Sequence, residues 1–351
     1  MKRFFVYRGI HKFKPDVKFF DWEIHSNMNL RSELKIKPSA KKIHLADPVM
    51  LMGSCFSDNI GRKLEAFKFN VLINPFGTLY NPHSIFNLVD NISSELNNLD
   101  EKEIVFHQGI YRYLGFHSAI SSPDKKQLTD YAATAFRNST QFLSGAKWLI
   151  ITLGTAIVYL FKESGSIAAN CHKLPPNRFE RQMMTVEEII QEFDKMMKSL
   201  TKINSNIQIM LTVSPVRHLK EGFENNQVSK SILRLACDSI ATRNDNVVYF
   251  PAYEIMMDDL RDYRFYAEDL VHPNSLAIEY IWEKFMDSGF DEETRDFIAE
   301  WGKILKALNH KPFYPGTAEH KQFIRETIIK LQSFRGKVNV EEEIKKLNDQ
   351  L

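Results

Sequence analysis

A short apolar run that ends at a glycine constrains the fold of this chain most. Residues 48–52 are mostly apolar and of strand length, and Gly53 breaks the run with a tight turn. A helix reaching about residue 69 is expected next, with Ser57 as its N-cap. Its apolar residues recur at the spacing of one helical face: Ile60, Leu64 and Phe67. Because a buried strand leads directly into a helix here, the segment predicts a sheet with helices packed against it.

Two side chains that can act as nucleophiles occupy this turn, Ser54 and Cys55. In a strand, turn and helix they lie at the carboxyl end of the strand, beside the unpaired N–H groups of the first helical turn. Those donors favour a thiolate or a developing oxyanion, and they are expected to lower the pKa of Cys55. The alternative is a compact connection in which Cys55 is a small buried apolar residue, as most free cysteines are.

Further segments of strand length alternate with helices along the chain. We expect strands at residues 70–74, 148–153, 207–213 and 247–250, and helices that begin near residues 83, 127, 185 and 227. Thr185 and Glu188 form a capping box for one helix, whose apolar stripe is Ile189, Phe193, Met196 or Met197, and Leu200. This order predicts an α/β protein with a mostly parallel sheet, helices on both faces, and a ligand site beyond the carboxyl ends of the strands.

Composition divides the chain into three parts. Residues 1–27 form an N-terminal extension, and Met28 is the expected start of the domain; residues 28–290 form the α/β domain; residues 291–351 form a helical extension with a solvated tail. Within the domain, residues 30–42 are expected to be an edge strand or an extended lead-in. Residues 100–125 are expected to form a small hairpin or an excursion near the active face.

Charge and cysteine content exclude several classes of protein. The chain has 46 Lys and Arg against 44 Asp and Glu, so nothing indicates a nucleic-acid partner or an anionic membrane surface. No apolar run reaches the roughly 18 residues that a membrane-spanning helix needs. Three widely spaced cysteines argue against a disulfide framework and favour a reducing compartment, so a cytoplasmic protein is expected.

No cofactor or metal is expected from motifs. The chain contains neither GxxxxGK[ST] nor GxGxxG, the phosphate-binding patterns of nucleotide sites. Cys171 and His172 are adjacent, but no second Cys/His pair has the spacing of a zinc site.

A second segment with reactive side chains lies far downstream, directly before an amphipathic helix. Asp269 and His272 stand three residues apart, so the carboxylate can fix the tautomer of the imidazole while the ring reaches a nucleophile. The alternative is a solvent-exposed turn with a capping residue, because turns rich in Asp, His, Pro and Asn are common. Paired with a nucleophile at a strand end, the catalytic interpretation gains weight.

Five segments in order resemble the GSCFA domain family, which is itself similar to the SGNH/GDSL hydrolases. They are Gly53-Ser54-Cys55-Phe56 and residues 74–82, 152–156, 214–218 and 269–273, and the resemblance covers roughly residues 28–330. It implies a three-layer α/β fold of flavodoxin-like type and acyl-ester chemistry. It does not imply a substrate, because one fold hosts many functions.

The resemblance also implies roles for individual residues. Cys55 takes the position of the hydrolases' nucleophilic serine, and Ser54 takes that of an aspartate; a slip of one residue would make Ser54 the attacker, and Cys55 is favoured. Asp269 and His272 match the final hydrolase block. His272 would take the proton of the nucleophile, and Asp269 would orient His272.

An oxyanion hole is implied as well, with one departure. Gly77 matches the glycine whose N–H stabilises the oxyanion, and Gly154 and Thr155 match the third block. Ala156 stands where those enzymes place an asparagine, which removes a donor typically worth about 3 kcal/mol of transition-state stabilisation. Either Asn74, Asn170 or another group compensates, or the reaction is slower or different.

The expected function is therefore hydrolysis or transfer of an acyl group on a small-molecule or carbohydrate-like substrate. Acyl-coenzyme A is the donor that a thiol nucleophile would suit. Arg217 and His218, just beyond a strand end, either bind a substrate carboxylate or phosphate or cap the following loop. The competing hypotheses are a catalytically silent carbohydrate- or peptide-binding module and, less favoured, a protein-interaction role for the helical C-terminal region.

Overall fold

The computed structural model describes residues 32–94 and 99–351. The predicted extension over residues 1–27 lies outside the described residues. Residues 33–351 form one compact unit.

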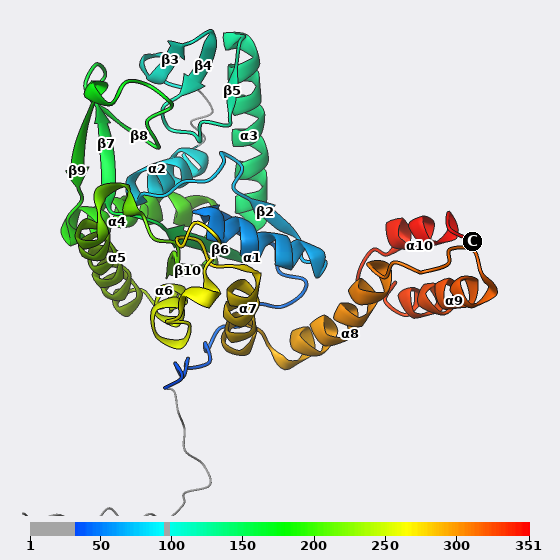
Figure 1. Cartoon of the computed structure of the whole chain (residues 1–351). Helices are drawn as coiled ribbons and strands as arrows, with labels where there is room; N and C mark the ends of the chain where they lie inside the picture. The colour runs from blue at the N-terminus through cyan, green and yellow to red at the C-terminus, as the bar shows by residue number, and fades with distance from the viewer. Residues whose placement is uncertain (1–31, 95–98) are drawn as a thin grey trace, which may run out of the picture. The chain divides into compact units, whose positions relative to one another are not determined.

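A parallel sheet of five strands forms the centre of this unit (Figure 1). Its strands, in the order in which they pair, are β11 (Val247–Phe250), β10 (Gln208–Val213), β6 (Trp148–Leu153), β1 (Val49–Gly53) and β2 (Val71–Ile73). All four pairings are parallel. Strands β1 and β6 are buried along their whole length, as continuous apolar runs predict for strands covered on both faces. The expected parallel sheet of an α/β protein is thereby confirmed.

Successive side chains of β1 pack into two different hydrophobic cores, because neighbours in a strand point to opposite faces. Met50 and Met52 belong to the core formed with α2 (Pro82–Ser93), α3 (Lys125–Gly145), α4 (Val186–Ile203) and α5 (Phe223–Arg243). Val49 and Leu51 belong to the core formed with α1 (Cys55–Ala66) and α7 (Ser275–Gly289). Helices therefore cover both faces of the sheet.

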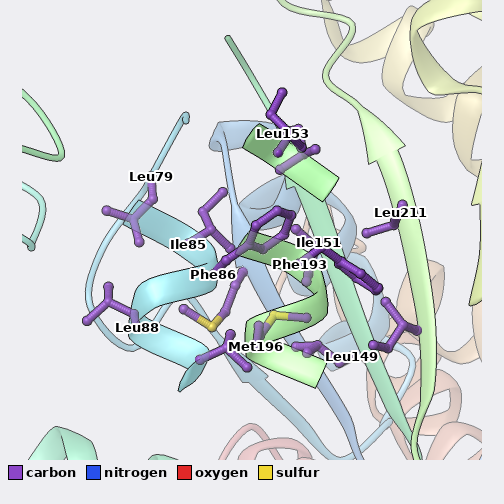
Figure 2. Close-up of a cluster of buried hydrophobic side chains, with 14 of the residues drawn as sticks. Leu79, Ile85, Phe86, Leu88, Leu149, Ile151, Leu153, Phe193, Met196 and Leu211 are labelled. Carbon is purple, nitrogen blue, oxygen red and sulfur yellow. The ribbon is translucent and has the colours of Figure 1, made fainter. Parts of the chain in front are cut away.

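Helix α4 has the predicted cap and stripe. Both hydrogen bonds of the Thr185–Glu188 capping box are present, and the buried residues are Ile189, Phe193, Met196 and Leu200. Phe193 meets Phe86 of α2 edge-on, with ring centroids 5.6 Å apart. Figure 2 shows Phe86, Phe193 and Met196 together with Leu149, Ile151 and Leu153 of β6. This core fixes the position of β6 beside β1.

Two small antiparallel sheets lie outside the parallel one. The first joins β3 (Ile104–His107), β4 (Ile110–Tyr113) and β5 (Ser121–Ser122), so the predicted hairpin within residues 100–125 is present and gains a third strand. The second joins β7 (Ile157–Phe161), β8 (Ser166–Ala168) and β9 (Phe179–Met183) and was not predicted from the sequence.

Short helical segments connect several elements: 3₁₀ turns η1 (Glu101–Glu103), η2 (Pro176–Arg178), η3 (Leu219–Glu221) and η5 (Tyr263–Phe265), and α6 (Ala252–Glu254) with the π-helical segment η4 (Ile255–Asp259).

Residues 30–42 were expected to be either an edge strand or an extended lead-in. The described part, residues 32–42, forms no strand. Directly after it, Ile43 makes an isolated parallel bridge to Phe290, outside the three sheets. The segment is therefore an extended lead-in.

Three helices follow the α/β part: α8 (Glu292–Leu308), α9 (Ala318–Gln332) and α10 (Glu341–Asn348). Trp301 of α8 is fully buried, and its indole N–H donates to the carbonyl of Ala66 at 2.9 Å, at the last residue of α1. The predicted solvated tail is only half right, because Ile344 and Leu347 of α10 are buried. These helices share one hydrophobic core with α1 and α7.

Candidate functional site

The turn after β1 requires glycine. Gly53 has φ +138°, and a Cβ placed there would lie 2.2 Å from the carbonyl oxygen of Thr152 in the neighbouring strand β6. The next residue returns to that same carbonyl, because the Ser54 N–H donates to Thr152 at 3.2 Å. The chain can therefore leave β1 only by pressing its backbone against the end of β6.

Ser54 is the N-cap of α1 and is fully buried. Its Oγ accepts a hydrogen bond from the Phe56 N–H at 3.3 Å and donates one to Ser214 Oγ at 3.0 Å, across the end of β6. The prediction of Ser57 as the cap is wrong. The helix begins earlier, at Cys55, and the buried Ser57 hydroxyl instead donates to Thr152 Oγ1 at 2.8 Å.

Cys55 is the first residue of α1 and is half-buried. Burial raises the pKa of its thiol, and the carboxylate of Asp58 raises it further. The N–H groups of Cys55 and Phe56 and the amine of Lys230 lower it, but they do not outweigh burial. The expected depression of the Cys55 pKa is therefore not found, because the helix N-terminus acts on a thiol that is largely removed from water.

Lys230 on α5 belongs to this cluster and was missed in the sequence. Its side chain is 1% exposed, and its Nζ donates to the carbonyl oxygen of Ser214 at 2.8 Å. Burial lowers the pKa of Lys230 to about 7, although the negative charge of a Cys55 thiolate acts to raise it. A signal was available: the buried stripe of α5 formed by Leu233, Cys237 and Ile240 continues one turn back to Lys230, so a lysine occupies a core position.

Asp269 and His272 do come together. His272 Nδ1 lies 2.6 Å from Asp269 Oδ2, while Asp269 Oδ1 accepts the N–H groups of Val271 and His272, each at 2.9 Å. These bonds lower the pKa of Asp269 to about 2, with the backbone donors contributing most. Both side chains are about half exposed. The carboxylate is therefore ionised and holds the ring by one nitrogen, which leaves Nε2 for other contacts.

Arg217 and His218 connect the two groups. The Arg217 N–H donates to the Val271 carbonyl at 3.4 Å, and its guanidinium donates to Tyr266 Oη at 2.8 Å and lies over that ring. His218 is largely buried, and burial, reinforced by the charges of Lys230 and His272, lowers its pKa to about 3. Neutral His218 thus lies within the electrostatic range of both clusters, and its buried Nε2 has no partner among the described residues.

The predicted oxyanion donors are bonded within the protein. The Gly77 N–H donates to the Asn74 carbonyl at 2.8 Å, and the N–H groups of Gly154 and Thr155 both donate to the Tyr80 carbonyl, at 2.7 and 3.0 Å. The Ala156 N–H donates to Ser229 Oγ at 2.7 Å. The N–H groups of Cys55 and Phe56 are the backbone donors that face the sulfur.

Asn74, one of the two side chains expected to compensate for Ala156, is hydrogen-bonded within the protein at both ends of its amide. Its Oδ1 accepts the Gly53 N–H at 2.8 Å, and its Nδ2 donates to Asp58 Oδ1 at 2.7 Å. It therefore ties the nucleophile turn to Asp58. Asn170 lies elsewhere, hydrogen-bonded to Ser118 and to the His172 N–H at 2.9 Å.

The candidate nucleophiles Cys55 and Ser54 are not joined directly to His272. Within residues 32–94 and 99–351, no hydrogen bond connects His272 to Cys55 or Ser54. What the structure brings together is Ser54, Ser214, Lys230 and Cys55 on one side and Asp269 with His272 on the other, linked by Arg217 and His218. One backbone hydrogen bond, from the Arg217 N–H to the Val271 carbonyl, joins the Asp269–His272 turn to the segment that follows β10.

The adjacent pair Cys171 and His172 has a packing role. His172 is buried, its Nε2 lies 3.1 Å from the Leu114 carbonyl, and burial lowers its pKa to about 4. Over the described ranges, no group of three or more His, Cys, Asp or Glu side chains could hold a metal ion.

Comparison with known families adds two matches. The model of the GSCFA family matches residues 48–285, and the model of the C-terminal domain of GSCFA domain proteins matches residues 301–351. No curated protein matches the chain. A search of the described helices finds none with the length and apolar character needed to cross a bilayer.

Proposed function

This chain belongs to the GSCFA family, and we propose that it is an acyl-ester hydrolase or acyltransferase that works through Cys55, His272 and Asp269. The observation that carries the proposal is the Asp269–His272 pair. Three hydrogen bonds hold the Asp269 carboxylate in an exposed turn, and one of them, 2.6 Å long, goes to His272 Nδ1. Such a pair presents a base of fixed tautomer to solvent and substrate, which a merely structural turn does not need.

The sheet supports a relation to flavodoxin-like folds of the SGNH-hydrolase type. Counted along the chain, the five strands pair in the order second, first, third, fourth, fifth. That is the order of flavodoxin-like sheets, in which ligands bind beyond the strand ends where the order reverses. Here the reversal lies between β1 and β6, and Ser54 and Cys55 follow β1 directly.

Between the two candidate nucleophiles, the contacts favour Cys55. The hydrogen of Ser54 Oγ is engaged by Ser214, and Ser54 is fully buried as the helix cap. Cys55 is only half-buried and starts the helix, where the Cys55 N–H would face the oxyanion that forms on the carbonyl oxygen of an acyl group attacked by the sulfur. A thiol nucleophile suits transfer from a thioester such as acyl-coenzyme A to a hydroxyl, for instance on a carbohydrate, in the cytoplasm.

The proposed reaction needs a bound substrate to relate His272 to Cys55. In the structure His272 and Cys55 share no hydrogen bond, and catalytic hydrogen bonds often tighten only once a substrate is bound. His272 would then pass a proton between the acyl-accepting hydroxyl or water and the leaving group, with Asp269 stabilising the charged ring.

The test is turnover of chromogenic acetyl esters and of acetyl-coenzyme A by the whole protein. Loss of turnover is expected in Cys55→Ala and His272→Ala, while Cys171→Ala, which removes another half-buried thiol, should retain it. Turnover that survives Cys55→Ala but not Ser54→Ala would move the nucleophile to Ser54. If the unaltered protein turned over none of the acetyl esters or acetyl-coenzyme A, the proposal that it is an enzyme would be contradicted.

A second candidate function, binding without catalysis, rests on the backbone N–H groups that were expected to form an oxyanion hole but are bonded within the protein. Because Ala156 replaces an asparagine and the Gly77 N–H is bonded to Asn74, the same scaffold could bind an acylated carbohydrate without converting it. Calorimetric binding of acetylated oligosaccharides without product would favour this alternative, and a covalent acyl-Cys55 adduct seen by mass spectrometry would exclude it.

A further inference from the structure

A buried lysine without a carboxylate partner lies beside the candidate nucleophile. Lys230 is 1% exposed, and no ion pair to an Asp or Glu is present for it within the described ranges. Burying a charged ammonium is costly unless an anion compensates it. The protein nevertheless keeps an amine here, at a position of α5 where a leucine or methionine would fill the core without that cost.

The amine is held in a defined place. Its Nζ donates to the Ser214 carbonyl at 2.8 Å and lies 5.4 Å from the centre of the Tyr253 ring. Ser214 in turn accepts the hydrogen bond of Ser54, whose neighbour in the chain is Cys55. A short series of contacts thus fixes the Lys230 amine next to the nucleophile turn.

Cys55 is the anion-forming group that follows Ser54 at this turn; among the described residues no hydrogen bond joins its sulfur to Lys230 Nζ, and the two are related through Ser54 and Ser214. Each of the two acts on the charge of the other, and no other charged group counteracts the burial of Lys230. Asp58 faces Cys55 from within α1 and disfavours its thiolate, and His218 and Tyr253 face Lys230 from the loop after β10 and from α6. At neutral pH a substantial share of Lys230 is uncharged, because burial lowers its pKa to about 7.

We propose that Lys230 is the general base for Cys55. As the sulfur attacks the acyl carbon of an ester or thioester, the S–H bond breaks, the S–C bond forms, the π pair of the C=O bond moves to the carbonyl oxygen, and the proton moves to the lone pair of Lys230 Nζ, which becomes an ammonium. The inference deepens the proposed function, since it leaves His272 for the proton transfers of the acceptor and leaving group.

The test measures the rate at which iodoacetamide alkylates Cys55 at each pH between 6 and 10. Peptide mass spectrometry quantifies the alkylated Cys55. A neutral base beside the thiol should give a rate that rises with a midpoint near 7 in the unaltered protein. Lys230→Met should remove that midpoint and slow alkylation at pH 7.5 by about tenfold or more, which corresponds to a change of about one unit in the effective pKa. Cys171 in the same sample is the internal reference, and Lys198→Met, an exposed lysine of α4, is the matched control.

Lys230→Arg separates a base from a mere positive charge, because arginine does not give up its proton in this range. It should behave as Lys230→Met; an unchanged profile would overturn the proposal. If both variants fail to fold, judged by circular dichroism, the profile of the unaltered protein decides: a midpoint near 7 that persists in His272→Ala supports Lys230, and a midpoint above 9 contradicts it.

Alkylation needs no acyl substrate, so the two proposals can fail separately. A Lys230-dependent profile without ester or thioester turnover would leave the base in place and end the enzyme proposal. Turnover that needs Cys55 but is unaffected by Lys230→Met would support the enzyme proposal and overturn Lys230 as the base.

Discussion

The two halves of the candidate site are built by opposite means. Ser54, Ser214 and Lys230 come from three separate segments, are buried, and are held by contacts between residues far apart in the chain. Asp269 and His272 stand three residues apart on an exposed turn and are held by hydrogen bonds within that turn. A local pair can be recognised from spacing alone, whereas a tertiary cluster exists only once the sheet has formed.

The difference also inverts the electrostatics. In the buried half, loss of water dominates: it lowers the pKa of Lys230 and raises that of Cys55, so both neutral forms are favoured. In the exposed half, hydrogen bonds dominate and lower the pKa of Asp269, so the charged form is favoured. The buried half therefore favours an uncharged thiol and an uncharged amine, and the exposed half holds an ionised carboxylate.

The largest effect is expected from breaking the buried half at its turn. Gly53→Ala places a methyl group against the Thr152 carbonyl at a φ of +138°, so the free energy of unfolding should fall by about 3–5 kcal/mol. Urea denaturation measures it. Gly145→Ala, in open space at the end of α3, should change stability by less than about 1 kcal/mol. Equal effects of the two substitutions would contradict the close approach at Gly53.

The exposed half should respond in activity and hardly in stability. Asp269→Asn removes the negative charge from His272 and favours the wrong tautomer, so kcat should fall about a hundredfold or more, with nearly the same melting temperature. Steady-state kinetics on an accepted ester and a thermal melt measure both quantities. Asp262→Asn, on a 3₁₀ cap nearby in the sequence, is the control and should retain kcat. A large fall in melting temperature would mean that the pair is structural.

The buried half should show its lysine in the pH dependence of stability. The folded pKa of Lys230 is about 7 and its ordinary value is 10.5, so between these values the unfolded chain binds more protons than the folded one. The free energy of unfolding should therefore rise from pH 7 to pH 9, by up to about 1.4 kcal/mol per pH unit from this one group. Lys230→Met should flatten the slope in urea titrations at each pH, and an unchanged slope would contradict the buried amine.

The smallest effect is expected for the helix cap. Ser54→Ala removes the acceptor for the Phe56 N–H and should cost about 1 kcal/mol of stability. If Cys55 is the nucleophile, kcat should stay within a few-fold. Ser57→Ala, which removes another buried hydroxyl of α1, is the matched control for stability. Complete loss of turnover in Ser54→Ala alone would reverse the assignment of the two neighbours.

Much of the fold could be predicted from local patterns. The strands at residues 148–153 and 247–250 have the predicted bounds, and the capping box at Thr185 is present, because continuous apolar runs and caps are local signals. The cap of α1 was misplaced because both Ser54 and Ser57 satisfy the local preference. Only the close packing of Gly53 on Thr152 makes the helix begin at Cys55.

The site could be predicted only in part, for the same reason. Asp269 and His272 follow from their spacing, and Cys55 from its strand end. The use of the N–H groups of Gly77 and Gly154 by neighbouring carbonyls depends on how loops fold back, which no spacing encodes. Lys230 was missed because a single lysine in a long helix is ordinarily solvated, and only the stripe that it interrupts marks it as buried.

The hydrogen bond from Trp301 to Ala66 has a practical consequence for dissecting this protein. Ala66 ends the helix that begins with Cys55, and the buried faces of Leu64, Trp282 and Trp301 belong to one core. A recombinant fragment trimmed to residues 28–290 would leave that core open to water and the far end of α1 without its indole partner. Reactivity of Cys55 measured on such a fragment would be that of a thiol on a helix that has lost its packing against Trp301.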